Sequence, residues 1–204
     1  MIVIAVQACG VLVFLAGSVG LGRAIRRKDG RLPVARACRL SHALFWGALV
    51  APGLVGAFRP GLQAYDDVLG LPALPPSPLW TVAGAALLLV GVVLMVLSNR
   101  ALAVQGLGAP SFLLTRQLAV EGLYRRTRNP MSLGFYAAGV GAGLWAGSLA
   151  VTLGMLLVIA PAHMVNLKYF EEHELILRYG RDYVEYMARV PFLMPKSLLE
   201  RRNK

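Results

Sequence analysis

Long apolar runs alternate along this chain with short segments that hold nearly all of its charges. Residues 1–22 contain no Asp, Glu, Lys or Arg, and as a helix this run would reach about 33 Å, enough to cross the hydrocarbon core of a bilayer. Two further apolar runs cover residues 40–58, which Pro52 interrupts, and residues 79–97. The pattern therefore predicts three membrane-spanning helices in residues 1–100.

The fourth apolar run differs in length. Residues 131–167 form a stretch of 37 residues without a charged side chain, which is too long for one crossing and short for two. The small residues Ala146, Gly147 and Ser148 near its middle indicate a tight turn between two helices. The fold expected is an all-α integral membrane protein with about five transmembrane helices, the fourth and fifth forming a tight hairpin. Four spans plus a re-entrant pair fit the same pattern.

Lys and Arg are distributed unevenly over the polar segments. Of the 21 in the chain, seven lie in residues 23–39, one in 59–78, five in 100–130 and eight in 168–204. The positive-inside rule then predicts an amino terminus outside and a cytoplasmic carboxyl terminus. The composition, rich in Ala, Gly, Arg and Leu, is typical of a bacterial protein, so we expect the bacterial cytoplasmic (inner) membrane.

The composition also argues against several other classes of protein. With 57% hydrophobic and 15% charged residues, the chain is far from the make-up of soluble domains. A net charge of +11 can indicate nucleic-acid binding, but there is no aromatic-basic strip, so the expected partner is the lipid bilayer and not a nucleic acid. Cys9 and Cys38 form no disulfide framework, and no Cys/His cluster has metal-ligand spacing. Basic residues follow the first run instead of preceding it, unlike a cleaved signal peptide.

Small residues recur in the fourth predicted helix. Gly139, Gly143 and Gly147 are spaced by four, with alanines beside them, which favours close packing of helix backbones. The embedded "GVGAG" follows no predicted strand, so packing is a better interpretation than a nucleotide-binding loop.

A helix start is predicted within "GLYRRTRNPMSLG", residues 122–134. Asn129 is a good N-cap residue and Pro130 suits the first helical position. The free N–H groups of such a start attract anions, and Arg128 adjoins it, so a carboxylate or phosphate could bind here. The alternative is that the arginines only mark the cytoplasmic side.

Two carboxylates follow the fifth predicted helix, in "PAHMVNLKYFEEHEL". A hairpin would return Glu171 and Glu172 to the level of Asn129, and opposed charges at one depth suit a zwitterionic ligand. The alternative is a solvated first turn outside the membrane. His163, which follows Pro161, is interpreted as a packing or kink-satisfying residue.

The polar tail predicts a cytoplasmic, interfacial C-terminal helix that covers the end of the bundle. Tyr179, Tyr183, Tyr186 and Val190 recur at helical spacing in "LRYGRDYVEYMARVPFLMP". This pattern is typical of aromatic anchors at a membrane surface.

Taken together in this order, "EGLYRRTRNPMSLG", an uncharged hairpin and "YFEEHELILRYGRDYVEYMARVPFLMP" resemble the isoprenylcysteine carboxyl methyltransferase family, and more loosely the phospholipid methyltransferases. The resemblance covers residues 106–195. It implies an S-adenosyl-L-methionine-dependent methyltransferase, with three N-terminal helices in residues 1–100 and the methyltransferase core in residues 101–204.

The resemblance also implies a cofactor site, in which residues 129–132 hold the amino-acid end of S-adenosyl-L-methionine and Glu171 takes its ammonium. The implied cofactor-binding residues are Arg116, Gln117, Leu118, Ala119, Tyr124, Arg128, Asn129, Pro130, Met131, Ser132, Glu171 and Glu172. On the acceptor side the family has an arginine where this chain has Leu167, so the adjacent Lys168 is the candidate substrate residue. Ser132 stands where a tyrosine is usual.

The function expected from these features is methyl transfer to a lipophilic acceptor, a carboxylate or thiol of a small molecule or lipid, at the cytoplasmic membrane face. Catalysis would rest mostly on alignment of the reactants, and no catalytic residue is assigned. Two alternatives stay open: a phospholipid amine N-methyltransferase, and a non-catalytic lipid-binding or assembly protein on the same scaffold.

Overall fold

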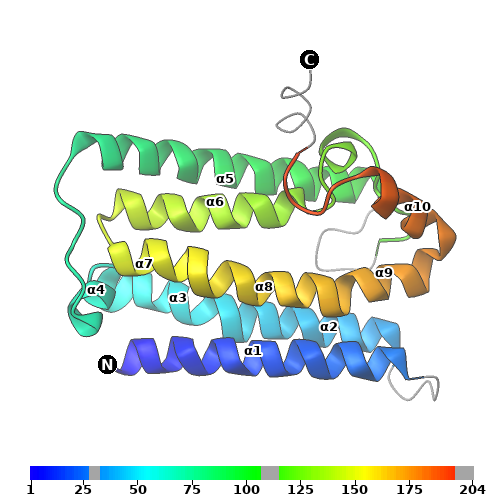
Figure 1. The fold of residues 1–204 in the computed structure, drawn as a ribbon, viewed down its shortest axis with the longest axis horizontal. Coiled ribbons are helices and arrows are strands. Elements are labelled where there is room, and N and C mark those ends of the chain that lie inside the picture. Colours follow the sequence, from blue (N-terminus) through cyan, green and yellow to red (C-terminus); the bar gives the residue numbers. More distant parts are fainter. Residues whose placement is uncertain (28–32, 107–114, 196–204) are drawn as a thin grey trace.

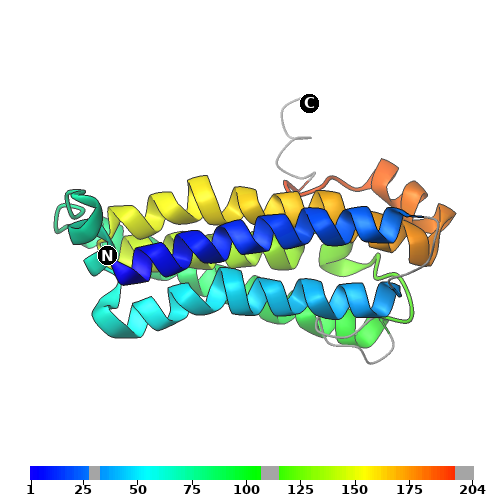
Figure 2. The same ribbon diagram turned by 90° about the horizontal axis from the view of Figure 1, so that it is seen from below.

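The structure is a computed structural model that describes residues 1–27, 33–106 and 115–195. Over these residues the chain forms an elongated helical bundle without a strand (Figures 1 and 2). The parts of the expected cytoplasmic loop and tail that fall in residues 107–114 and 196–204 lie outside the described residues.

Five apolar helical segments run along the length of the bundle. The first is α1 (Ile2–Arg26), and the second is one bent segment made of α2 (Val34–Leu44), the π-helical η1 (Phe45–Val50), α3 (Ala51–Gly56) and η2 (Ala57–Gly61). The third and fourth are α5 (Pro78–Gln105) and α6 (Pro130–Trp145). The fifth consists of α7 (Leu149–Gly154), η4 (Met155–Ile159), α8 (Ala160–Asn166), η5 (Leu167–Glu171) and α9 (Glu172–Tyr179).

Short elements occupy the two ends. Helix α4 (Ala64–Leu69) lies in the loop between the second and third segments, and the 3₁₀ turn η3 (Gly122–Arg125) precedes α6. Helix α10 (Arg181–Arg189) follows α9 across the opposite end of the bundle (Figure 1).

Four of the segments are long and apolar enough to cross a membrane, namely Ile2–Arg26, Val34–Gly61, Pro78–Gln105 and Leu149–Tyr179. Helix α6 has 16 residues and is therefore about 24 Å long, shorter than a typical span. All five expected helices are present, and four of them meet the length of a full crossing. Large apolar side chains cover the outside, for example Val82 and Leu157, which are 68% and 69% exposed. Such a surface identifies an integral membrane protein.

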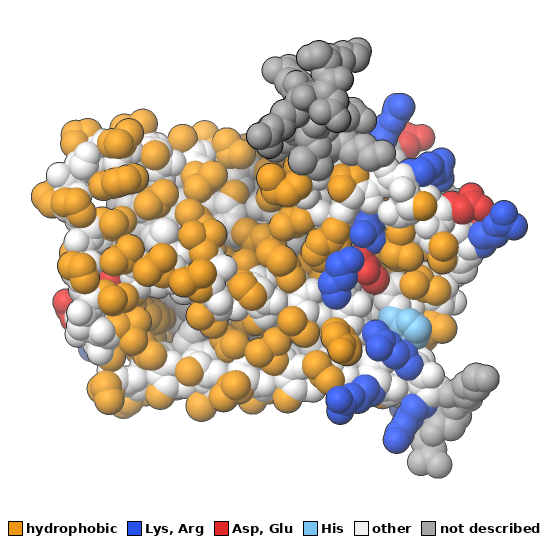
Figure 3. Space-filling view, in the orientation of Figure 1, with side chains coloured by type: hydrophobic (Ala, Val, Ile, Leu, Met, Phe, Trp, Pro, Cys, Tyr) orange, Lys and Arg blue, Asp and Glu red, His pale blue; other side chains and the backbone are white. Residues whose placement is uncertain are grey.

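The charged side chains lie mainly at one end of this apolar surface. Figure 3 shows Lys and Arg gathered where α1 ends and where α9 and α10 lie, while hydrophobic side chains cover the rest of the face. This end is called the basic end below. It holds the end of α5 and the start of α6.

The expected hairpin turn is confirmed at residues 146–148. Gly147 has φ +69, a left-handed conformation that glycine adopts without strain, and the Ser148 hydroxyl accepts from the Val151 N–H to begin α7. Helix α4 secures the turn, because an Asp66 carboxylate oxygen accepts a 2.7 Å hydrogen bond from the N–H of Ala150.

Helices α5 and α6 lie side by side with their backbones in direct contact. A Cβ at Gly91 would come within 2.4 Å of the Ala138 nitrogen, and one at Gly84 within 2.4 Å of the Trp145 nitrogen. On the α6 side, a Cβ at Gly141 would meet the Leu88 nitrogen at 2.3 Å. The absence of side chains at these glycines sets the spacing of the two helices.

The glycines singled out in the sequence have a different partner. Gly139 faces the Met155 side chain and Gly143 faces Thr152, so both pack against the returning helix of the hairpin. The predicted close packing holds for these two, whereas Gly147 lies in the turn and belongs to no helix face.

The C-terminal helix is present, but its tyrosines are not membrane anchors. Tyr183 and Tyr186 are 3% and 4% exposed and form a core cluster with Val190, against which Leu118 and Tyr179 pack. The anchor interpretation was wrong because an apolar helix face can pack on lipid or on protein, and here a preceding loop covers it.

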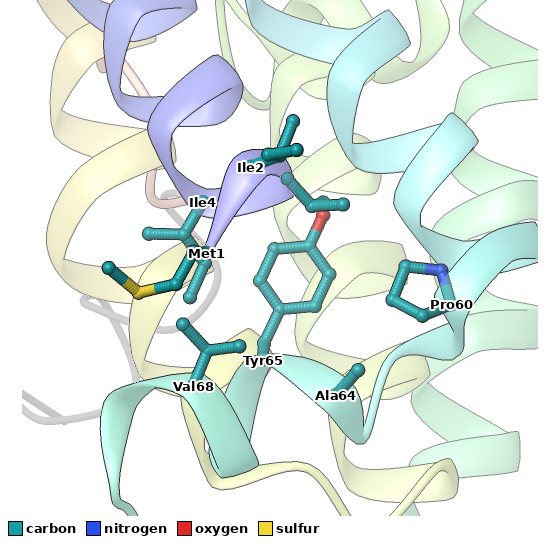
Figure 4. A pocket seen from close by; sticks show the side chains of 8 residues that line it. Met1, Ile2, Ile4, Pro60, Ala64, Tyr65 and Val68 are labelled. Atoms are coloured by element: carbon teal, nitrogen blue, oxygen red, sulfur yellow. The ribbon is translucent and has the colours of Figure 1, made fainter.

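A small apolar cavity lies at the end opposite the basic one, between the start of α1 and α4. Its volume is about 220 Å³, and Tyr65 from α4 points between Ile2 and Pro60 into it (Figure 4). The Tyr65 hydroxyl is buried without a hydrogen-bond partner among the described residues. No carboxylate or basic side chain is among the residues that line it, so it offers no group that could orient a charged ligand.

The contact between α5 and α6 leads to a stability prediction. Replacing Gly91→Ala should lower the free energy of unfolding in detergent by about 1–3 kcal/mol, because the added methyl overlaps backbone atoms that cannot move independently. Gly20→Ala on α1 is the matched control, since nothing lies within 4 Å of its added Cβ. Unfolding midpoints measured by denaturant titration should separate the two variants, and equal midpoints would contradict the proposed contact.

Candidate functional site

A cavity of about 260 Å³ lies at the basic end of the bundle. Residues of α2, η1, α5, α6, α8, η5, α9 and α10 line it, together with the segment that precedes α6. Helix α5 packs mainly on α6, and α2 packs on α1 and η1, so the cavity lies between helices of two separate layers. Charged side chains from three of these elements, α9 and the segment before α6 among them, line it.

One wall of the cavity is the start of α6. Pro130 is the first helical residue, as predicted, and Asn129 occupies the N-cap position. The Asn129 side chain makes no capping bond; its Nδ2 donates instead to the Phe192 carbonyl at 2.9 Å. Among the described residues, neither the Met131 nor the Ser132 N–H meets an acceptor. Asn129 thus holds the predicted N-cap position, but its side chain does not cap the helix, and the helix start is left with free donors beside the cavity.

Arg128 joins this helix start to the other wall. Its Nη1 donates to Glu172 at 2.7 Å, with the two side chains 10% and 16% exposed. Its Nε is buried and has no partner among the described residues. Lys168 binds the same carboxylate at 3.0 Å, so Glu172 is held by two cations while the buried Nε of Arg128 is left without an acceptor.

Glu171 differs from the neighbouring carboxylates. Glu172 is paired with Arg128, and Glu174 with Arg178 at 2.8 Å. Within the described residues Glu171 makes no hydrogen bond or ion pair, although it lines the cavity. It ends the π-helical turn η5 (Leu167–Glu171), a type of irregularity that often occurs at functional sites. An unpaired carboxylate in a largely enclosed cavity is costly unless a ligand cation meets it.

The segment before α6 is fastened to α9 by side chains. Arg178 donates through Nη2 to the Thr115 carbonyl, and the Tyr179 hydroxyl donates to the Gln117 carbonyl at 3.2 Å. These bonds bring Ala119, 5% exposed, and Tyr124, 8% exposed, against the cavity. The segment therefore forms an apolar side wall.

Helix α10 closes the same region. The Tyr186 hydroxyl donates to the Tyr124 carbonyl at 2.6 Å. Burial raises the pKa of Tyr124, Tyr183 and Tyr186 well above the usual range, and the nearby Glu171 carboxylate adds to the shift of the first two. These phenols stay protonated at neutral pH, and the Tyr186 hydroxyl is thereby able to donate to the Tyr124 carbonyl.

The structure brings most of the sequence-predicted residues to one cavity. Those that line it are Leu118, Ala119, Tyr124, Arg128, Asn129, Met131, Ser132, Glu171 and Glu172. Arg116 and Gln117 instead line an adjoining depression of about 480 Å³ with Asp182 and Arg189. Pro130 shapes the helix start without lining the cavity. Lys168 does not line it either; its ammonium lies 4.1 Å from the centre of the Phe192 ring and binds Glu172.

Apart from His163, which the sequence analysis interpreted as a packing residue, the inner half of the cavity was not predicted. Helices α2 and α8 and the turn η1 line that half, with polar and aromatic side chains placed inside apolar runs. These residues are Ser41, His42, Phe45, Trp46, His163 and Asn166. The available signal was the presence of polar and ionisable groups within membrane segments, which usually marks function.

Comparison with known proteins agrees with this geometry. The family model described as "Phospholipid methyltransferase" matches residues 79–182, half of the chain. The chain belongs to the phospholipid methyltransferase family. The predicted resemblance to membrane methyltransferases is thereby confirmed. The match covers α5, α6, the long helix that follows and the start of α10, and thus most of the basic end.

One curated relative is similar over a shorter stretch. It is methanethiol S-methyltransferase 2 of Bradyrhizobium diazoefficiens, 37% identical over 83 residues, which are 40% of this chain and 30% of that protein. The matched stretch thus spans less than a third of that protein's length. No solved structure matches the chain.

The two adjacent glutamates should respond differently to neutralisation. Glu172→Gln should lower the free energy of unfolding by about 2 kcal/mol, because it leaves the nearly buried Arg128 without its charge-assisted hydrogen bond. Glu171→Gln removes no protein partner and should leave stability unchanged or raised. Unfolding midpoints of both variants in the same detergent test this, and a larger loss for Glu171→Gln would contradict the assigned pairing.

Proposed function

We propose that this protein transfers a methyl group from S-adenosyl-L-methionine to a lipophilic acceptor at the cytoplasmic face of the membrane. The observation that carries the proposal is the unpaired Glu171 carboxylate across the cavity from a helix start with free N–H groups. The amino-acid end of S-adenosyl-L-methionine is a zwitterion, and a negative group opposite a positive helix start is complementary to it.

The donors and acceptors left over in the cavity fit this group. Glu171 would accept from the ammonium, while the Met131 and Ser132 N–H groups and the unused Nε of Arg128 would donate to the carboxylate. The remainder of the cofactor would lie against the apolar wall that includes Leu118 and Ala119. When bound, the cofactor supplies an electrophilic methyl group on a sulfonium.

The protein's own contribution is to align the reactants and to exclude water. Tyr183, Tyr186 and the 190–195 segment cover the cavity from the basic end, with the Arg128 N–H donating to the Pro191 carbonyl at 2.9 Å. A covered cavity strengthens the charge interactions that orient a ligand and holds the reacting groups in one geometry.

The acceptor would enter the cavity from the lipid-facing side, away from the basic end. Trp46 of η1 lines the cavity and is also 44% exposed on the apolar surface, so the cavity reaches the lipid-facing side between α2 and α5. The basic end faces the cytoplasm under the positive-inside rule, where a water-soluble cofactor is supplied. The proposed location is the bacterial inner membrane.

The acceptor group is proposed to be a carboxylate or a thiol, with a thiol favoured. The similar stretch of the Bradyrhizobium protein belongs to an enzyme named for a small thiol. The family description favours a second candidate, N-methylation of a phospholipid amine.

Cofactor binding is the first test. Calorimetry on detergent-purified protein should show saturable binding of S-adenosyl-L-methionine, and Glu171→Gln should weaken it about 10- to 100-fold, since a charge-assisted hydrogen bond contributes about 1.5–3 kcal/mol. Asp67→Asn on α4 is the control, because that exposed carboxylate lies at the opposite end of the bundle. Wild-type protein that binds no cofactor would overturn the enzymatic proposal in favour of a non-catalytic membrane protein.

Product chemistry then identifies the acceptor. With a labelled methyl donor and membrane extract, we expect a neutral product whose label resists mild base, as for a thioether. A label released by base would indicate a methyl ester, and a product that keeps a positive charge would indicate a methylated amine. The last outcome would replace the thiol preference by the phospholipid candidate.

A further inference from the structure

The inner half of the cavity contains a histidine that the cofactor end of the site does not use. His163 is 8% exposed and lines the cavity from α8. Its Nδ1 lies 3.1 Å from the Tyr136 hydroxyl of α6. Nε2 has no hydrogen-bond partner among the described residues, and it is not one of the fully buried unpaired atoms. It is therefore accessible. One ring nitrogen is thus fixed by the protein, and the other is open to the cavity.

Aromatic rings surround this imidazole. The ring centres of Phe45, Phe135 and Phe14 lie 4.6, 6.0 and 6.3 Å from that of His163. An imidazole enclosed in this way is held in one orientation. Its open Nε2 is the atom that a small molecule in the inner half of the cavity would meet.

The position of His163 separates it from the cofactor end. Eight residues along the same continuous helix separate it from Glu171, roughly 12 Å at 1.5 Å per residue, and both side chains line the same cavity. A methyl donor held at Glu171 would occupy the space toward His163. The acceptor's reacting atom would then lie between the donor and the imidazole.

We propose that His163 is the catalytic base for a small thiol acceptor and that Tyr136 is its positioning residue. The inference rests on the proposed function. With Nδ1–H donated to the Tyr136 oxygen, Nε2 carries a lone pair and accepts the proton of the thiol.

The step balances as a methyl transfer coupled to proton transfer. As the acceptor sulfur forms its bond to the methyl carbon, the S–H bond breaks, its electron pair stays on that sulfur and the proton moves to Nε2. The bond between the methyl and the donor sulfonium breaks with its electrons kept by the donor sulfur. The positive charge, at first on the sulfonium, is thereby transferred to the protonated imidazole of His163. Both sulfur products are neutral thioethers.

The surroundings favour a thiol over the other acceptors. A carboxylate arrives ionised and needs no base, and the inner half offers it no Lys or Arg, since the arginines that line the cavity are Arg128 and Arg178 at the basic end. A charged amine would find no carboxylate beside the aromatic rings. Sulfur makes favourable contacts with aromatic edges, so Phe45 and Phe135 suit an uncharged thiol.

Kinetics with two thiols test the role of the base. In His163→Gln, transfer to an alkanethiol should fall about 10²- to 10⁴-fold, the range lost with a general base, while transfer to a more acidic aryl thiol, already ionised, should fall less than tenfold. His173→Gln is the matched control, because this histidine does not line the cavity. Tyr136→Phe keeps the imidazole but removes the hydroxyl that binds its Nδ1. The rate of transfer to the alkanethiol should fall less than in His163→Gln, with the same preference for the aryl thiol.

A binding measurement without the methyl donor gives a second readout. In protein with ¹⁵N-labelled histidine, the Nε2 resonance of His163 is assigned as the one that is absent from His163→Gln. Adding ethanethiol should shift this resonance. The proposal would be overturned if the transfer rates to the two thiols fell equally in His163→Gln and Tyr136→Phe, or if ethanethiol left the Nε2 resonance unchanged. His163 would then be a packing residue. Calorimetry distinguishes this outcome from failure of the proposed function. If the variants still bind S-adenosyl-L-methionine, only the role of His163 is wrong. If wild-type protein binds no S-adenosyl-L-methionine, the proposed function itself is wrong.

Discussion

The ion pair between Arg128 and Glu172 joins parts of the chain that are 44 residues apart, and the geometry of the site depends on it. It holds the start of α6 against the junction of η5 and α9. Because Arg128 and Lys168 both bind Glu172, that carboxylate is neutralised, and among the described residues Glu171 is the cavity carboxylate left without a partner. The pair also places the unused Nε of Arg128 beside the free N–H groups of the helix start. One contact thus creates both the negative and the positive side of the site.

The sequence predicted the structure correctly where a local pattern is compatible with only one arrangement of the backbone. An uncharged run of 37 residues with small residues at its centre folds back on itself, and this brings the arginines and the paired glutamates to one level. Pro130 begins a helix because its ring fits the first turn. The hairpin, and the approach of Arg128 to the paired glutamates at one end of the bundle, could therefore be predicted from the sequence.

Other features depend on partners that are distant in sequence, and local patterns do not encode them. Asn129 has the chemistry of a cap, but its amide binds a carbonyl 63 residues away, at Phe192. Tyr183 and Tyr186 have the spacing of an amphipathic helix, which does not distinguish lipid from a covering loop. The aromatic wall around His163 is assembled from three separate helical segments, and two of them, with Phe14 and Phe45, precede the 79–182 family match. The acceptor pocket proposed here therefore includes residues outside the part shared with the family.

The shortness of α6 has a consequence for the surrounding bilayer. Helix α5 runs for 28 residues beside it, whereas α6 ends after 16 and falls about 6 Å short of a 30 Å hydrocarbon layer. A helix this short is accommodated where the bilayer thins locally or where other protein fills the remaining depth. At the basic end the start of α6 is joined to the 190–195 segment, because the Arg128 N–H donates to the Pro191 carbonyl. A cavity beside such a helix start would let a solute from water and a solute from lipid meet at one boundary without either crossing the other's phase.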